Sequence, residues 1–145
     1  MSSFTAPLEL RLWPSSKDKF GYDVYVTARE FAYRIDNDYD RLIIVPKDTP
    51  TNLGTVPPGF RWLLPEITEP DGYAVQCTVL HDYLVGEFQG KELPLRDQGT
   101  GRQEAHRIFL QSLEVMGLPK WKRRIVRIGL WFGDRYARWH GRDIS

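Results

Sequence analysis

A run of prolines, glycines and threonines in the middle of the chain limits what the sequence can fold into. Residues 48–59 read DTPTNLGTVPPG, and three prolines and two glycines among these twelve residues exclude a continuous helix or strand there. The segment is therefore predicted to be an ordered loop or a surface linker. It separates a first half with the pattern of strands from a second half with the pattern of helices.

The half before this loop is predicted to be β structure. Four segments alternate or cluster β-branched and aromatic residues between turn signals: LELRLW at 8–13, YDVYVTA at 22–28, FAYRI at 31–35 and RLIIVP at 41–46. The turn at 36–40 is rich in Asp and Asn, which raises the question of calcium. A helix-loop-helix calcium site needs Gly and Glu where this chain has Arg41 and Lys47, so an ordinary hairpin turn is favoured.

The half after the loop is predicted to contain three helices, over residues 73–84, 103–116 and 122–139. Apolar residues lie nearly all round the first helix, which is typical of a helix buried between layers. Gly117 and Pro119 end the second. We therefore expect an α+β fold in which an N-terminal antiparallel β-sheet packs against about three C-terminal helices. The 145 residues form a single domain, β-rich over 1–58 and helical over 73–140, and this length is enough for a core without disulfides.

The charge of the chain is divided unevenly. Residues 1–118 carry 12 basic and 17 acidic side chains, whereas residues 119–145 carry 8 basic and 2 acidic ones. A basic segment of this kind either binds an anionic partner such as nucleic acid or packs on the acidic body of its own fold. Packing is favoured, because the segment is also rich in large apolar residues, among them Trp121, Ile125, Val126, Ile128, Leu130, Trp131, Phe132 and Trp139. Trp131 and Trp139 are accordingly expected in the core rather than in a base-stacking platform.

The residues most able to carry chemistry are His81 and Asp82, inside the predicted buried helix, and His106, near the start of the next helix. Burying ionisable groups is costly unless they are paired, hydrogen-bonded or bound to a metal. One interpretation is structural, with His81 and Asp82 satisfying the backbone of the loop at 51–59. The other is a metal site, since His81, Asp82 and His106 with a water would suit zinc and Lewis-acid hydrolysis.

Short motifs do not decide between these two interpretations. The chain has no HExxH or CxxC pattern, and it has no Walker loop, GxGxxG or GxSxG motif, so nucleotide binding by a standard loop is excluded. Cys77 and His81, four residues apart, lie on one helix face and would allow a thiolate-imidazolium pair. A lone cysteine in a buried helix more commonly packs in the core.

The order of four segments resembles a known family. The segments are Thr51-Asn52-Leu53-Gly54-Thr55-Val56-Pro57 after a strand ending in Ile-Val-Pro, Leu80-His81-Asp82-Tyr83-Leu84, Arg102 to Phe109, and Val126-Arg127-Ile128-Gly129. Together they resemble the phage and prophage family catalogued as domain of unknown function 1353, which has T-D-x-A-S-V-P, H-D-Y-L-Y, R-x-x-A-D-x-x-F and V-R-x-x-G motifs. The similarity covers residues 8–140.

What the resemblance implies is a context and a set of positions rather than a reaction. The polar positions of the family map onto Asn52, His81, Asp82 and His106, which would meet in one pocket beside the 51–57 loop. An Asp is expected at Asn52 and again at His106. The loss of two carboxylates implies either a nitrogen-rich metal site or a site that has kept only a structural role.

Two functions from different classes follow. The first is a phage-encoded, metal-assisted hydrolase in which His81, Asp82 and His106 bind a divalent metal, zinc before others, with His81, Asp82 and Asn52 catalytic and Asn52 orienting substrate or water. The second is a non-catalytic virion component of the tail or baseplate.

The expected partners and location follow from the same reasoning. Other phage structural proteins are the expected partners, and nucleic acid is left open through residues 119–145. No membrane partner is expected, since no apolar run could span a bilayer and the N-terminus lacks the pattern of a signal peptide. Cys77 is the only cysteine and cannot form an internal disulfide, which fits a virion or the host cytoplasm.

Overall fold

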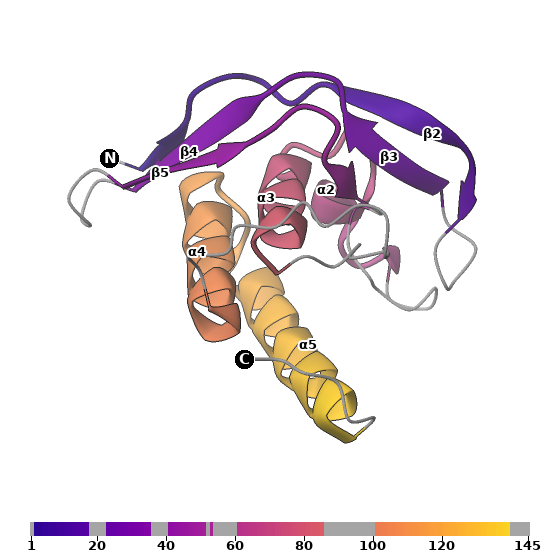
Figure 1. Cartoon of the computed structure of the whole chain (residues 1–145). Coiled ribbons are helices and arrows are strands. Elements are labelled where there is room, and N and C mark those ends of the chain that lie inside the picture. The colour runs from indigo at the N-terminus through magenta and orange to yellow at the C-terminus, as the bar shows by residue number, and fades with distance from the viewer. Residues whose placement is uncertain are drawn as a thin grey trace.

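The computed structural model describes residues 2–17, 23–35, 41–51, 53, 61–85 and 101–139. In Figure 1 the strands form one curved layer, and helices α2, α3 and α4 cover its inner side while α5 extends away from it. The prediction of an α+β fold, with strands in the first half and helices in the second, is confirmed. The Asp-rich turn at 36–40 lies outside the described residues.

The strand layer consists of two small antiparallel sheets rather than one. Strands β1 (Ser3–Phe4), β4 (Phe31–Ile35) and β5 (Arg41–Val45) form the first sheet, in the order β1-β4-β5. Strands β2 (Leu10–Lys17), β3 (Asp23–Thr27) and β6 (Pro50–Thr51) form the second, in the order β2-β3-β6. The chain passes from the second sheet to the first between β3 and β4, over residues 28–30.

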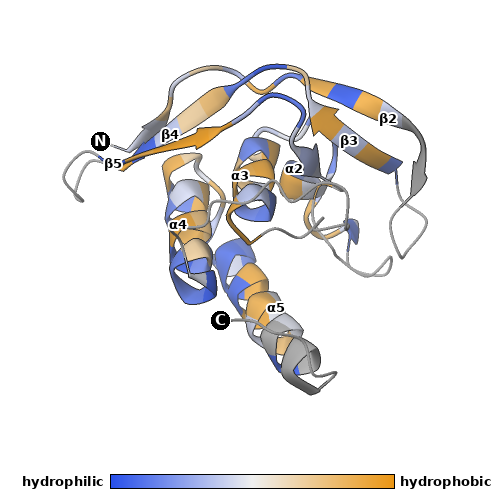
Figure 2. Cartoon of the chain, in the orientation of Figure 1, coloured by the Kyte–Doolittle hydropathy of each residue, from blue (hydrophilic) through white to orange (hydrophobic). Residues whose placement is uncertain are grey.

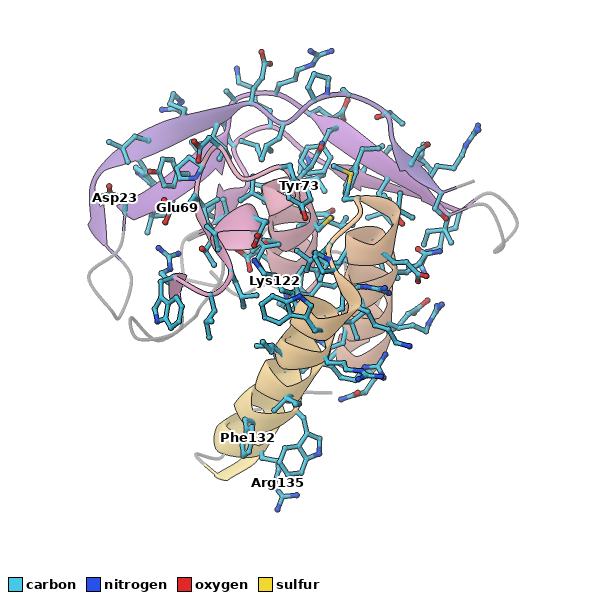
Figure 3. All side chains as sticks on the ribbon, turned by 180° about the vertical axis from the view of Figure 1, so that it is seen from behind. Asp23, Glu69, Tyr73, Lys122, Phe132 and Arg135 are labelled. Carbon is cyan, nitrogen blue, oxygen red and sulfur yellow. The ribbon has the colours of Figure 1, made fainter. Side chains whose placement is uncertain are left out.

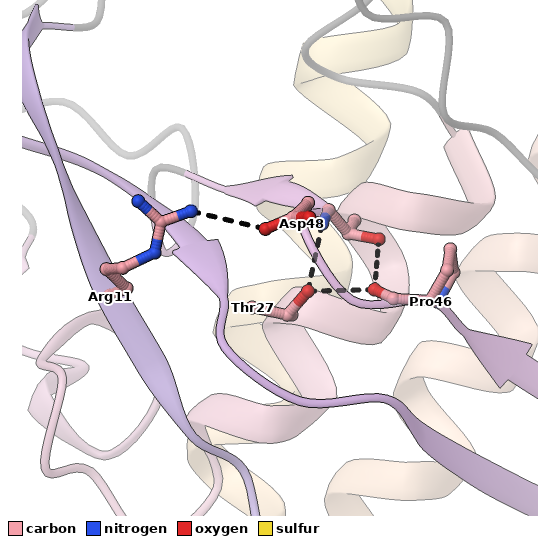
Figure 4. A network of polar contacts seen from close by, with 5 residues as sticks. Arg11, Thr27, Pro46 and Asp48 are labelled. Atoms are coloured by element: carbon pink, nitrogen blue, oxygen red, sulfur yellow. Dashed lines mark hydrogen bonds and ion pairs between the residues drawn. The ribbon is translucent and has the colours of Figure 1, made fainter.

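The two-residue strand β6 lies inside the segment that was predicted to be irregular. A polar turn holds it against β3: the Thr27 hydroxyl donates to the Pro46 carbonyl at 2.8 Å and accepts from the Thr49 amide at 2.9 Å. Figure 4 shows this turn together with Arg11, whose guanidinium donates to Asp48 at 3.2 Å. Proline is tolerated in β6 because edge strands need no donor on their outer side. These contacts bring Thr51 opposite Tyr25.

Four helices follow within the described part of the chain. They are α2 (Pro65–Thr68), α3 (Val75–Val85), α4 (Arg102–Val115) and α5 (Lys120–Trp139). The three long helices agree with the predicted ones to within two residues at each end. Helix α2 lies in a stretch for which no helix was predicted. Pro65 is compatible with it because proline stands at the first helical position, where a missing N–H costs nothing.

Helix α3 is the centre of the molecule, and it joins two groups of buried apolar residues. On the sheet side, Val79, Leu80 and Leu84 pack with Tyr33 and Val45. On the helix side, Cys77 belongs to a second group with α2, α4 and α5. Nine of the eleven α3 residues are buried, which confirms the prediction of a helix enclosed between layers.

A polar link closes the N-terminal strand onto α4. The amide of Gln111 donates to the Ser2 hydroxyl at 3.1 Å and its carbonyl accepts from the Tyr33 hydroxyl at 2.8 Å. Burial raises the pKa of Tyr33 to about 12, although its contact with Ser2 opposes this shift. Tyr33 is therefore a neutral donor at physiological pH, and the link connects residues that are 109 positions apart.

The expectation that the basic C-terminal segment packs on the acidic body is only partly right. Lys122 pairs with Glu66, and Arg123 lies 3.5 Å from Glu114, so two cations do contact body acids. Four large apolar residues of α5 are nevertheless more than half exposed: Trp121, Ile128, Trp131 and Phe132. Trp131 is therefore not in the core, while the side chain of Trp139 lies outside the described residues.

Orientation and length together explain this difference between expectation and structure. Val126 and Leu130 face the buried group between the helices, whereas the four exposed residues lie on other sides of α5. A helix of 20 residues is also about 30 Å long, and Figure 1 shows its far end extending away from the body. Figure 3 shows Lys122 beside the body and Phe132 and Arg135 at the far end of the helix. The structure contains no helix long and apolar enough to cross a membrane among the residues it describes.

Candidate functional site

The candidate site begins with two neighbouring polar residues on α3. Successive residues of a helix are rotated by about 100°, so His81 and Asp82 cannot face the same way. His81 faces α4 and remains partly exposed, whereas Asp82 faces β6 and is 4% exposed. The two neighbouring residues therefore make contacts on two different sides of α3.

The contact of His81 is a second histidine. Its Nε2 lies 2.9 Å from Nδ1 of His106, which is 7% exposed on the second turn of α4. At this distance the two imidazoles share a hydrogen bond, so one ring nitrogen carries the proton and the other accepts it. The structure therefore confirms that these two residues meet, although 25 positions separate them in the chain.

An aromatic ring fixes the plane of the His81 imidazole. Phe109 stacks on it with ring centroids 4.6 Å apart and an interplanar angle of 26°. Phe109 is three residues after His106, so both project from one face of α4. Glu104, two residues before His106, faces elsewhere and pairs with Arg41 of β5. The His pair is thus held on one side by an aromatic ring and kept apart from the Glu104 ion pair.

The contact of Asp82 is the hydroxyl of Thr51. Thr51 donates its hydroxyl hydrogen to the Asp82 carboxylate, and the same hydroxyl oxygen accepts from the Leu53 amide at 3.0 Å. Thr51 is fully buried, and Leu53 is 2% exposed in the core. Asp82 therefore attaches the segment after β6 to the central helix. This agrees with the structural interpretation of Asp82.

The backbone next to this attachment is unusual. Leu53 has a φ of 59°, in the left-handed region that a branched side chain rarely adopts. A conformation of this kind costs about 1–3 kcal/mol and persists only where the surroundings impose it. Here the hydroxyl of Thr51 and the buried position of the Leu53 side chain impose it. Arg61 adds a hydrogen bond to the Leu53 carbonyl at 3.4 Å.

The structure places the predicted site residues in two groups instead of one. His81 meets His106, and Asp82 meets Thr51; within the described ranges, no three His, Cys, Asp or Glu side chains converge as a metal site would require. Asn52, between Thr51 and Leu53, lies outside the described residues. His81, Asp82 and His106 each have further interactions beyond those described above.

The environment of Cys77 does not suit a thiolate-imidazolium pair with His81. Cys77 is fully buried in the apolar group on the helix side, and burial raises the pKa of its thiol to about 12, against the opposing contact with Ser112. A thiol in this environment stays protonated at neutral pH and is a poor nucleophile. The interpretation of Cys77 as a core residue is confirmed.

Two residues of the site, Phe109 and Thr51, were not among the predicted site residues, although both stand in the segments that resemble the family. Phe109 could also have been found from its spacing, because positions i and i+3 of a helix share a face and His106 was already a candidate. Thr51 had no signal of spacing. Its role depends on β6 pairing with β3, and that pairing depends on contacts between segments far apart in the chain.

Comparison with known proteins gives one match. A family model described as "Protein of unknown function (DUF1353)" matches residues 26–129. The match includes all four segments on which the resemblance rests and ends at Gly129. No curated protein matches the chain, and no solved structure does.

Proposed function

We propose that this chain, which belongs to the DUF1353 family of proteins of unknown function, is a hydrolase whose reactive centre is the His81–His106 pair. One observation carries the proposal: two imidazole nitrogens lie 2.9 Å apart, one ring partly exposed and the other nearly buried. Such a pair is a means of holding a proton or a cation at a defined point. A core packed only for stability gains little from two histidines in contact.

The chemistry of the pair follows from its hydrogen bond. Because one nitrogen donates and the other accepts, His106 fixes the tautomer of His81. Phe109 restricts rotation of the same ring. With the shared proton on Nε2 of His81, Nδ1 of the same ring would be the nitrogen that takes a proton from a water or a substrate hydroxyl, which is the work of a general base. His106, deeper in the protein, then stabilises the charge that His81 acquires.

The pair would also supply two of the ligands that a divalent metal needs, with zinc as the first choice. The two imidazole nitrogens lie 2.9 Å apart, so both would reach one ion if the rings moved apart and turned toward it. A bound zinc would supply Lewis-acid polarisation of a carbonyl or phosphoryl oxygen and an acidified water. We propose His81 and His106 as its ligands.

Asp82 and Asn52 have supporting roles in this proposal. Asp82 accepts a hydrogen bond from Thr51, and the Thr51 hydroxyl in turn accepts from the amide of Leu53; these two residues flank Asn52 in the chain. Asn52 is proposed to orient substrate or water. Through Thr51, Asp82 is proposed to position Asn52. Asp82 is also the carboxylate that directly follows His81 in the chain. Replacement of Asp82 would then affect the KM of a substrate as well as stability.

Metal uptake and hydrolysis test the proposal together. The purified protein is titrated with Zn²⁺, and its metal content is measured by inductively coupled plasma mass spectrometry; chromogenic esters and phosphodiesters serve as substrates. His81→Ala and His106→Ala are expected to lose both uptake and hydrolysis. Arg107→Ala, an exposed neighbour of His106, is the matched control and keeps both. Absence of hydrolysis in the wild type, or full activity in both histidine variants, contradicts the proposal.

A second candidate is a non-catalytic structural component, of a phage tail or baseplate as the resemblance implies. The hydrogen bond from Thr51 to Asp82, together with the one from the Leu53 amide to Thr51, favours it, because these contacts serve stability without any reacting group. Here His106→Ala is expected to lower the free energy of unfolding by about 1–3 kcal/mol, since it leaves a partner of a hydrogen bond unpaired. If the protein is a hydrolase, His106→Ala is expected to be tolerated or to stabilise the fold, and to abolish activity.

A further inference from the structure

The last helix has two apolar sides that face different surroundings. From a rotation of about 100° per residue, Trp121, Ile128 and Phe132 fall within an arc of about 40° along one side. Val126 and Leu130 lie on the other side, where they contact the buried group between the helices. The inner side explains how α5 is attached to the body. The outer side is mostly exposed, and at its edge Ile125 packs against the same buried group.

The outer side is a continuous apolar strip. Trp121 and Ile128 are each 55% exposed and Phe132 is 61% exposed, and the strip extends over about 16 Å of the helix. Trp131, 53% exposed, borders it and packs edge-on against Phe132 with centroids 4.9 Å apart. Figure 2 shows the apolar residues continuing along α5 after it leaves the body. Exposed apolar surface of this kind marks an interaction site.

A row of cations runs beside the strip. Lys120, Arg124, Arg127 and Arg135 are all exposed, and the helical rotation places them together along one edge of the strip. Within the described ranges, no ion pair joins Lys120, Arg124 or Arg127 to an acid. Arg135 lies over the ring of Trp131, 4.6 Å from its centroid. These charges are available to a partner, unlike Lys122, which is paired with Glu66.

We propose that the outer side of α5 binds an anionic lipid surface. An amphipathic helix with Trp and Phe on one face and Lys and Arg beside them lies in the plane of the membrane interface. The apolar strip would enter the boundary between headgroups and acyl chains, and the cationic row would contact the negative headgroups. The charge of the row is complementary to such a surface along its whole length.

Two other occupants fit the charges less well. In a pair of α5 helices from two copies of this chain, the cationic row of one copy would meet cations of the other, and α5 contains only one acid, Asp134, to offset them. A nucleic-acid duplex would accept the cations but would leave the strip of Trp121, Ile128 and Phe132 in water. An anionic lipid surface takes up both features at once.

The inference departs from the sequence expectation of no membrane partner. That expectation rested on the absence of a run of residues long enough to span a bilayer. A helix that lies on a surface needs no such run, because only one of its faces enters the lipid. The distinction depends on the exposed fractions of Trp121, Ile128 and Phe132, and the sequence could not supply them.

Vesicle co-sedimentation tests the proposal. The wild type is expected to bind vesicles of phosphatidylglycerol and phosphatidylcholine in equal parts, to bind pure phosphatidylcholine at least tenfold more weakly, and to be released by salt. The double variant Trp131→Ser, Phe132→Ser is expected to lower the partition coefficient about tenfold or more. The double variant Arg124→Glu, Arg127→Glu is expected to do the same.

Matched controls separate this effect from a general loss of apolar or charged surface. Trp62→Ser removes an aromatic side chain that is 73% exposed elsewhere, and Arg29→Glu reverses a cation on the strand layer. Both should bind vesicles like the wild type. Because all the substituted residues are exposed, an unchanged urea midpoint verifies that each variant is folded.

Four results would overturn the proposal. The first is failure of the folded wild type to bind anionic vesicles, and the second is unchanged vesicle binding by both α5 double variants. The third is a dimer in sedimentation velocity that only the Trp131→Ser, Phe132→Ser variant abolishes. The fourth is binding to a DNA duplex without binding to vesicles. The third result would assign the face to a second copy, and the fourth would assign it to nucleic acid.

Discussion

The hydroxyl of Thr51 joins β6 to α3 through the carboxylate of Asp82. It donates to Asp82 and accepts from the amide of Leu53, so both its hydrogen and its oxygen are used inside the core. A buried carboxylate that loses a donor and a buried amide that loses an acceptor are each left with a desolvation cost. The positive φ of Leu53 is maintained by the same contacts.

Thr51→Val should therefore destabilise the protein by about 2–4 kcal/mol, although valine has nearly the same shape. The measurement is urea unfolding at neutral pH, followed by circular dichroism. Thr51→Ser keeps the hydroxyl and is expected to lose less than half as much. If the valine variant unfolds at the same urea concentration as the wild type, the hydroxyl does not hold this attachment.

The sequence could identify the site residues but not their partners. His81, Asp82 and His106 stood out because ionisable residues in a buried helix need a reason. The division of the site into a His81–His106 contact and an Asp82–Thr51 contact depends on which way neighbouring residues of one helix point. That direction is set by the packing of α4 on one side and β6 on the other.

At the scale of elements, periodic segments could be predicted and short ones could not. The four long strands and three long helices follow from spacing of apolar residues within each segment. Strand β6 has two residues and helix α2 has four, too few for any period. Both exist because tertiary contacts support them. The division of the strands into two sheets also depends on such contacts.

The turn after α2 is held by a close approach of backbone atoms at Gly72. A Cβ on this residue would lie 2.4 Å from the carbonyl oxygen of Glu66, nearer than such atoms ever come. Gly72→Ala is therefore expected to destabilise the protein by about 1–3 kcal/mol, because the backbone has to move. Thermal unfolding, monitored by circular dichroism, measures the change.

Gly129 on α5 provides the matched control for that substitution. A Cβ there would meet nothing within 4 Å, and the residue lies within a helix. Gly129→Ala should stabilise the protein by up to about 1 kcal/mol through helix propensity. Equal effects of the two alanine substitutions would show that the approach at Gly72 does not constrain the turn.

At the scale of the whole molecule, the more buried of two described ion pairs between α5 and the body joins α5 to α2. Lys122 is 14% exposed and Glu66, on α2, is 19% exposed. Burial by itself would raise the pKa of Glu66, but the hydrogen bond and charge of Lys122 outweigh it and lower that pKa below its usual 4.5. A lowered folded-state pKa means that the ionised form stabilises the native state.

The stability contributed by Glu66 should accordingly be complete above about pH 4.5 and be lost as the pH falls through its lowered folded-state pKa. Glu66→Gln is expected to cost about 2 kcal/mol at pH 7 and progressively less in acid. Urea unfolding at a series of pH values checks this. The exposed Glu69→Gln is the control, with an effect within about 0.5 kcal/mol throughout. A pH-independent loss in Glu66→Gln would contradict the assignment.

The link between Ser2, Gln111 and Tyr33 has a consequence for the order in which the fold can form during synthesis. A ribosome releases β1, β4 and β5 long before it releases α4. Gln111 of α4 nevertheless donates a hydrogen bond to Ser2 and accepts one from Tyr33. The inner face of the first sheet, with Phe31, Tyr33 and Val45, therefore emerges from the exit tunnel without its cover. A nascent chain of this protein exposes that face until α3 and α4 have been translated, and this interval is when a chaperone that binds apolar segments would act.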